Sequence, residues 1–279
     1  MEFSVEAPAK INWFLSVVGK REDGFHDIVS AVQCVSLFDS LSFESSGEIE
    51  LASDLDIPRS ENLVYRTAVL LRRHASVGEG VRITLRKNIP AAAGLGGGSS
   101  DAAFTLMGLN RFWDLGLGEE ELKRLGAEIG SDVPFFIGGP FSLLEGRGER
   151  VSRLETGNSV VMLLVKPDIA IPASWAYGVY SAELTKKSID IKLFCQALDR
   201  QDFDSLRHMI FNDLEKGVTE KYHIIAEIKE LLIQNGALVA SMSGSGSAVF
   251  GVFHSEEEAQ GAALHMGEHW CRVVRTLYR

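Results

Sequence analysis

The sequence predicts an α+β protein. Amphipathic helical patterns and short apolar strand patterns interleave along its 279 residues. These patterns lack the regular alternation of strand, helix and strand that is typical of a doubly wound parallel sheet. No internal repeat is found, and the chain is long enough for one or two domains.

In the first half, residues 60–74 (SENLVYRTAVLLRRH) predict a helix capped by Ser60, with leucines at helical spacing. Residues 81–87 (VRITLRK) alternate apolar and polar side chains, which indicates a half-buried strand. Residues 119–130 (EEELKRLGAEIG) predict a second helix, because acids occupy its first turn and a glycine ends it.

In the second half, the apolar run 159–165 predicts a buried strand, and residues 222–236 predict an amphipathic helix. Residues 237–253 (ALVASMSGSGSAVFGVF) indicate a strand, a tight loop and a strand. Ser255 and Glu258 form a capping box before the next helix, and residues 271–278 predict a last strand. The polar, turn-rich stretch 147–158 lies between the halves. We therefore predict two domains, residues 1–150 and residues 151–279.

The composition excludes several classes of protein. The formal net charge is -10, and an acidic chain is a poor general binder of nucleic acids, because phosphate contacts need a basic surface. Three cysteines far apart (Cys34, Cys195 and Cys271) argue against a disulfide framework and a zinc cluster. The first residues lack a signal-peptide core, and no apolar run reaches membrane-spanning length. We expect a cytoplasmic protein with no membrane partner.

The stretch PAAAGLGGGSSDAA (residues 90–103) lies between the strand at 81–87 and a predicted helix. Glycine lets a ligand approach the backbone closely, and a helix start offers unpaired N–H groups with a partial charge of roughly +0.5. Together they form a site suited to phosphates. A Walker loop needs a GK[ST] ending and a Rossmann loop needs GxGxxG, and neither pattern is present. The sequence predicts a phosphate loop of another kind.

This stretch resembles the P-x-x-x-G-L-G-[GS]-[GS]-S-S motif of the GHMP small-molecule kinases. The resemblance implies a two-domain GHMP kinase fold with the active site in the cleft between the domains. It also implies that the loop wraps the phosphates of ATP, while Lys87 and Asn62 resemble the adenine-side contacts of the family. The residues implied in phosphate binding are Pro90, Ala91, Ala92, Ala93, Gly94, Leu95, Gly96, Gly97, Gly98, Ser99 and Ser100.

Three further stretches agree and follow in family order. Residues 7–30 (APAKINWFLSVVGKREDGFHDIVS) resemble the amino-terminal motif of one GHMP branch, whose substrate is a cytidyl-linked methylerythritol. GSDVPFF (residues 130–136) resembles the segment that carries the catalytic aspartate. MSGSGSAVF (residues 242–250) resembles the third motif, another glycine loop near the active site. The four matches cover most of the chain.

The resemblance implies a role for each matching residue. Asp132 accepts the proton of the substrate hydroxyl, and Lys10 keeps that aspartate ionised. Asn12 and His26 contact the substrate, with His26 on the cytosine edge. Phe25, where the family usually has tyrosine, stacks on the cytosine together with a second aromatic. That second residue is Tyr177 or Trp175.

Two assignments stay open. Mg²⁺ is expected to bridge the ATP phosphates, but no ligand is assigned to it. Asp101 adjoins the loop and serves either the metal or only the helix start. The diphosphate of the substrate needs donors, and Lys20 and Arg21 are either those donors or part of a solvated loop.

The implied reaction transfers phosphate from ATP to the 2-hydroxyl of the cytidyl substrate, in non-mevalonate isoprenoid synthesis. A GHMP kinase for mevalonate, homoserine or a sugar is one alternative, which the DGFH stretch (residues 23–26) disfavours. A nucleotide-binding regulator would need neither Lys10 nor Asp132. A scaffold without a ligand would not need four glycines beside two serines. A monomer and a homodimer are both compatible with the sequence.

Overall fold

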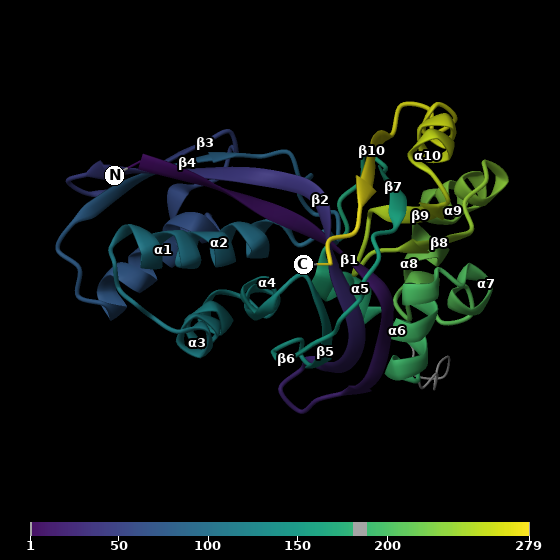
Figure 1. The fold of residues 1–279 in the computed structure, drawn as a ribbon, viewed down its shortest axis with the longest axis horizontal. Helices are drawn as coiled ribbons and strands as arrows, with labels where there is room; N and C mark the ends of the chain where they lie inside the picture. The colour runs from purple at the N-terminus through teal and green to yellow at the C-terminus, as the bar shows by residue number, and fades with distance from the viewer. Residues whose placement is uncertain (1, 181–188, 279) are drawn as a thin grey trace. The chain divides into compact units, whose positions relative to one another are not determined.

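The computed structural model describes residues 2–180 and 189–278 (Figure 1). Strands and helices are mixed along the chain, which confirms the α+β class. The strands are β1 (Glu2–Lys20), β2 (His26–Ser46), β3 (Ile49–Ser53), β4 (Gly80–Arg86), β5 (Phe141–Gly146), β6 (Arg150–Arg153), β7 (Val161–Lys166), β8 (Val239–Met242), β9 (Val249–Phe253) and β10 (Trp270–Arg275). The helices are the 3₁₀ turn η1 (Arg59–Glu61), α1 (Leu63–His74), α2 (Gly97–Phe112), α3 (Glu119–Ile129), α4 (Val133–Gly138), α5 (Ala173–Gly178), α6 (Ile191–Arg200), α7 (Phe203–Leu206), α8 (Glu215–Lys221), α9 (Ile224–Gln234) and α10 (Glu256–Ala263).

The contacts divide the chain into two compact units, and each is discontinuous in sequence. Unit 1 comprises the N-terminal residues through Ala9, Leu37–Ala91 and Gly96–Gly139. Unit 2 comprises Lys10–Ser36, Ala92–Leu95 and the described residues from Pro140 onward. The interleaving arises because the long strands β1 and β2 each contribute residues to both units.

The sequence predicted one boundary near residue 150, from the polar composition of residues 147–158. Part of that stretch is strand β6, which pairs antiparallel with β5 inside unit 2. Its polar residues belong to a hairpin and not to a linker. A division into functional domains 1–150 and 151–279 stays a prediction.

In unit 1, β4 lies between β2, its antiparallel partner, and β3, its parallel partner. Helix α2 packs closely on this sheet, since a Cβ on Gly108 would lie 2.5 Å from the ring of Phe43. Figure 1 shows α1 and α2 next to each other below the strands of this unit. The predicted strand 81–87 and helix 119–130 are confirmed as β4 and α3.

The predicted cap of α1 was wrong by two residues. Ser60 lies in the 3₁₀ turn η1, and Asn62 is the N-cap. The side chain of Asn62 accepts a hydrogen bond from the backbone N–H of Val64 at 2.9 Å. Asn62 satisfies one of the unpaired donors at the helix start in this way.

In unit 2, an antiparallel sheet has the strand order β10-β7-β9-β8. Strands β7 and β9 are almost entirely buried, because both of their faces are covered. One face packs against α9 and α10. On the other face, the indole of Trp13 from β1 contacts the rings of Phe194 and Phe250, with centroids 6.2 and 6.1 Å away.

The predicted elements of the second half are confirmed as β7, α9, β8, β9 and β10. Ser255 caps α10, because its Oγ accepts the N–H of Glu258 at 3.1 Å. The three cysteines are free thiols. Across residues 2–180 and 189–278, no helix has the length and apolar character needed to cross a bilayer.

Candidate functional site

The glycine loop leads directly into α2, as predicted. Gly94 and Gly96 have left-handed backbones, with φ of +73° and +71°. Gly96 is the N-cap of α2 and provides no side chain to cap the first turn. The N–H groups at this helix start therefore keep their partial positive charge, as an anion site requires.

Close packing explains part of the glycine content. A Cβ on Gly94 would lie 2.0 Å from the carbonyl oxygen of Ser243. A Cβ on Gly97 would lie 2.9 Å from the side chain of Ile89. Gly98 is exposed, and a Cβ there would meet only an ordinary contact at 3.5 Å. Close packing thus accounts for Gly94 and Gly97, and a left-handed backbone accounts for Gly96. Gly98 is the position where an approaching ligand still explains the glycine.

Lys10 lies in β1 beside the first part of this loop. Its backbone N–H donates to the carbonyl of Leu95 at 2.9 Å, and its Nζ donates to Oδ1 of Asn12 at 2.6 Å. Asn12 in turn donates from Nδ2 to Oγ of Ser30 at 2.8 Å. Lys10 and Asn12 are each 5% exposed. Asn12 thus orients the ammonium group of Lys10, and its predicted contact with a substrate stays a prediction.

Asp132 occupies the N-cap position of α4, the short helix that carries the GSDVPFF motif. It is half-buried, and its side chain makes no capping hydrogen bond. Asp132 belongs to unit 1 and Lys10 to unit 2, so their cooperation stays a prediction.

Lys87 belongs to a buried charge cluster under the helix start. Its Nζ forms ion pairs with Oδ2 of Asp39 and, at 2.7 Å, with Oδ2 of Asp101. Oδ1 of Asp39 accepts the backbone N–H groups of Asn88 and Ile89 at 2.6 and 2.8 Å. Asp39 and Asp101 are 0% and 2% exposed. The cluster ties together the end of β4, strand β2 and the N-terminal half of α2.

Burial dominates the electrostatics of this cluster. It raises the pKa of Asp101, with Lys87 opposing the rise and Asp39 adding to it. The remaining oxygen of Asp101, Oδ1, is buried without a hydrogen-bond partner. Oδ2 of this carboxylate is committed to Lys87, and the choice between the metal role and the helix-start role of Asp101 stays open.

The ATP contacts predicted for Lys87 and Asn62 stay predictions. The structure gives each side chain an intramolecular partner instead, the two aspartates for Lys87 and the start of α1 for Asn62. Sequence reasoning missed Asp39. Its only signal was an aspartate at a buried position of an otherwise alternating strand.

An aromatic cluster surrounds the DGFH stretch. The rings of His26 and Tyr177 stack, with centroids 5.4 Å apart and planes inclined by 24°. Tyr180, which the sequence analysis missed, meets His26 edge-on at 6.2 Å. Trp175 instead contacts Tyr222 at 5.2 Å. Of the two open candidates, Tyr177 is therefore the one beside His26.

Phe25 is the exposed member of this region. Its side chain is 53% exposed, and the guanidinium of Arg147 lies 5.1 Å above its ring. An exposed aromatic ring of this kind is available for stacking. Arg147 lies in the turn between β5 and β6 and had no role in the sequence analysis.

The charged residues before Phe25 divide between two roles. Arg21 donates to Asp23 at 3.1 Å and to Asp27 at 2.9 Å, so it holds the turn together. This favours the loop role of Arg21 over a diphosphate contact. Lys20 lies close enough to His26 to lower its pKa, although burial is the larger cause.

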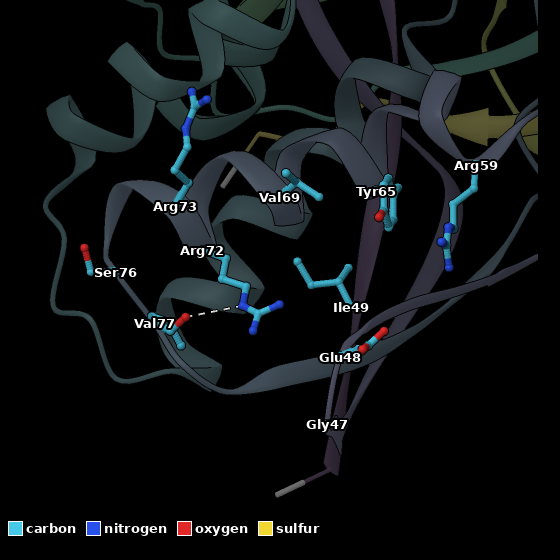
Figure 2. A pocket seen from close by; sticks show the side chains of 10 residues that line it. All are labelled: Gly47, Glu48, Ile49, Arg59, Tyr65, Val69, Arg72, Arg73, Ser76 and Val77. Carbon is cyan, nitrogen blue, oxygen red and sulfur yellow. Dashed lines mark hydrogen bonds between the residues drawn. The ribbon is translucent and has the colours of Figure 1, made fainter.

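Figure 2 shows a cavity of about 630 Å³ elsewhere in unit 1, between α1 and the turn from β2 to β3. None of the predicted site residues lines it. The guanidinium of Arg72 donates to the carbonyls of Val77 and Gly78, and Arg59 lies over the ring of Tyr65. Because neither Lys10 nor Asp132 lines the cavity, we do not assign the site to it.

Family models match both parts of the chain. The GHMP kinases N-terminal domain matches residues 62–140, and the GHMP kinases C-terminal domain matches residues 194–270. Fold and glycine loop thus define a GHMP kinase. The first match contains the glycine loop and Asp132.

Full-length relatives narrow this class. The chain is 45% identical to the 4-diphosphocytidyl-2-C-methyl-D-erythritol kinase of Thermodesulfovibrio yellowstonii, over 98% of this chain and 97% of that protein. It is 42% identical to the kinase of the same name from Caldanaerobacter subterraneus subsp. tengcongensis, over 92% and 90%. A crystal structure of a 4-(cytidine 5'-diphospho)-2C-methyl-D-erythritol kinase superposes with a TM-score of 0.86 at 32% identity, over 98% of this chain and 99% of that chain. The chain belongs to the family of the 4-diphosphocytidyl-2-C-methyl-D-erythritol kinases.

Proposed function

We propose that this chain transfers phosphate from ATP to the 2-hydroxyl of 4-diphosphocytidyl-2-C-methyl-D-erythritol, a step of non-mevalonate isoprenoid synthesis. Relatives at 45% and 42% identity carry the name of this kinase. The observation that carries the proposal is the buried Lys10 ammonium, which Asn12 orients beside the glycine loop.

The glycine loop binds the phosphates of ATP. The uncapped start of α2 supplies backbone N–H donors, and the exposed Gly98 leaves them accessible. No lysine of the Walker type is present, so main-chain amides and the hydroxyls of Ser99 and Ser100 cradle the polyphosphate. This arrangement places fixed dipoles where negative charge develops during transfer.

Lys10 and Asp132 prepare the acceptor hydroxyl. Asp132 takes its proton, and Lys10 draws the hydroxyl into line for transfer. The ammonium of Lys10 suits this task, because Asn12 fixes its direction and burial excludes water.

The aromatic cluster recognises the cytidyl group. Phe25 offers an exposed ring for stacking, and His26 offers ring nitrogens for the hydrogen-bonding edge of the base. Tyr177 stacks on His26 and holds that imidazole in place. Recognition of a nucleobase separates this chain from kinases whose acceptors have no base.

Mg²⁺ would neutralise the phosphates of bound ATP. Among the described residues, no three histidine, cysteine, aspartate or glutamate side chains form a metal cluster. Magnesium commonly takes substrate phosphates, waters and one or two carboxylates, so the protein need not supply a cage. The proposed cofactors are therefore ATP and Mg²⁺, and a cytoplasmic location follows from the use of ATP.

The test is incubation of the purified protein with ATP, Mg²⁺ and the cytidyl substrate, followed by phosphorus NMR. We expect a new phosphomonoester signal that grows as ATP is consumed. Mevalonate and homoserine serve as competing acceptors in the same assay. Preferential phosphorylation of either would assign the chain to another acceptor.

A further inference from the structure

The segment before α8 is joined to β1 downstream of Lys10. The N–H of Leu15 donates to the carbonyl of Phe211, and the N–H of Asp213 donates to the carbonyl of Leu15, both at 2.9 Å. Oδ2 of Asp213 accepts the N–H of Val17 at 2.8 Å. These bonds fix the segment to the strand that carries Lys10.

The same segment holds the third glycine loop. Nδ2 of Asn212 donates to two carbonyls of that loop, Met242 at 2.8 Å and Gly244 at 2.7 Å. An amide NH₂ group has two hydrogens, and both are used here. Glu215 adds a third bond, because its Oε2 accepts the N–H of Met242 at 2.9 Å. Asn212 is 8% exposed, so water competes little for these bonds.

The loop held by Asn212 lies against the ammonium of Lys10. A Cβ on Gly244 would lie 3.2 Å from Nζ of Lys10, and equally close to Oδ1 of Asn12 and the carbonyl oxygen of Gly94. The neighbouring Ser243 donates from Oγ to the same Gly94 carbonyl at 3.0 Å. The backbone at Gly244 thus forms a wall of the space that Lys10 occupies.

We propose that Asn212 is a positioning residue for Lys10. Its amide clamps the two carbonyls on either side of Ser243, and this clamp fixes the Gly244 backbone against Nζ. Loss of these two hydrogen bonds frees the Gly244 backbone to move and lets the Lys10 ammonium shift. The inference rests on the proposed kinase function, in which the direction of Lys10 matters for transfer.

The first test compares the kinetics of Asn212→Ala and Asn212→Asp with the wild type. Asp has nearly the shape of Asn but presents an oxygen to the two carbonyls, so it reverses the interaction. We expect kcat to fall by about 10- to 100-fold, as misplacement of a reacting group by about 1 Å does, with both KM values unchanged. A role in folding alone would lower the melting temperature and leave the kcat of folded protein unchanged.

Asn235→Ala is the matched control. Asn235 is half-buried and donates from Nδ2 to the carbonyl of Leu231 at 2.8 Å, at the end of α9. Within residues 2–180 and 189–278, no side-chain hydrogen bond joins Asn235 to the third glycine loop. We expect a comparable change in melting temperature and no change in kcat. Equal kcat losses in the Asn212 and Asn235 variants would overturn the inference.

A second readout does not depend on activity. Amine-reactive labelling, quantified by mass spectrometry, reports the accessibility of Lys10 against the exposed Lys192 as reference. We expect Lys10 to be labelled several-fold faster in Asn212→Ala than in the wild type. The labelling result and the activity result can differ. If Asn212→Ala is labelled faster but the wild type phosphorylates no cytidyl substrate, the positioning role is kept and the proposed function is rejected. Unchanged labelling and kcat in folded Asn212→Ala would reject the positioning role.

Gly244→Ala tests the same contacts should neither Asn212 variant fold. Its methyl group would press on Nζ of Lys10 from the wall side. We expect altered Lys10 labelling and a lower kcat. If both match the wild type, the wall does not position Lys10 and the inference fails.

Discussion

Tyr177 stacks on His26, with the ring centroids 5.4 Å apart. A covered ring face leaves the edge of the imidazole, with its two nitrogens, for hydrogen bonding. Burial, and to a smaller extent Lys20, lowers the pKa of His26 below its ordinary value. The lowered pKa favours the neutral imidazole, which has one N–H donor and one acceptor. That combination suits the edge of cytosine, which also has a donor and an acceptor.

The first prediction concerns pH. Because the pKa of His26 is lowered on folding, the unfolded chain takes up the proton first as the pH falls below about 6.5. The contribution of His26 to stability is then complete above that pH and is lost as the pH falls through the lowered pKa. Affinity for the cytidyl substrate should fall over the same range. Proton NMR of the imidazole C2–H should give a midpoint below the ordinary value.

Tyr177→Ala is the control for this titration. It exposes the imidazole face, so the pKa of His26 should rise towards its ordinary value. A wild-type midpoint above that value, or one that Tyr177→Ala leaves in place, would contradict the prediction.

Phe25→Ala should weaken recognition of the base. Stacking on an aromatic ring contributes about 1–3 kcal/mol per base, so KM for the cytidyl substrate should rise by roughly 5- to 140-fold. KM for ATP should stay the same, because we propose that the ATP phosphates bind at the glycine loop and not at Phe25. Phe25→Tyr keeps the ring and should retain the wild-type KM. Steady-state kinetics with each substrate varied in turn measures both constants, and an equal rise in the two would count against stacking.

Asp132→Asn should lower kcat by about 10²- to 10⁴-fold, the usual contribution of a positioned general base. Titration calorimetry with ATP should give the wild-type affinity. Full turnover in this variant would remove Asp132 from the mechanism.

Lys87→Met should lower the free energy of unfolding by about 3–5 kcal/mol, because it leaves Asp39 and Asp101 buried without their cation. Urea unfolding measures this change. Lys123→Met is the matched control, since Lys123 pairs with the exposed carboxylates of Glu119 and Glu120 and its loss should cost about 0–1 kcal/mol. Equal losses in both variants, with a raised KM for ATP in Lys87→Met alone, would make Lys87 a ligand contact instead of a structural cation.

Local patterns predicted much of the fold. Alternation over residues 81–87 and helical spacing over 119–130 correspond to β4 and α3, because the polarity of each side chain follows the face it occupies. The cap of α1 was misplaced, since Ser60 and Asn62 are both good caps and only the η1 turn decides between them. The boundary near residue 150 came from polarity, which a surface hairpin shares with a linker.

The site residues that the motifs indicate stay predictions. Lys10, Asp132 and the glycine loop carry a recognisable order of residue types. Asn212 carries no such pattern, and neither does Asp39, although each makes its contacts with residues far along the chain.

The amino-acid order by itself determined a strand, a glycine-rich turn and a helix start, because backbone freedom and helix polarity are properties of short segments. Tertiary structure alone decided that Asn212 meets Gly244 and that Lys87 meets two aspartates. Those contacts join residues 32, 48 and 14 positions apart in the sequence, and chain folding brings them together. A hydrogen bond of this kind depends on distance in space, which local sequence patterns do not encode.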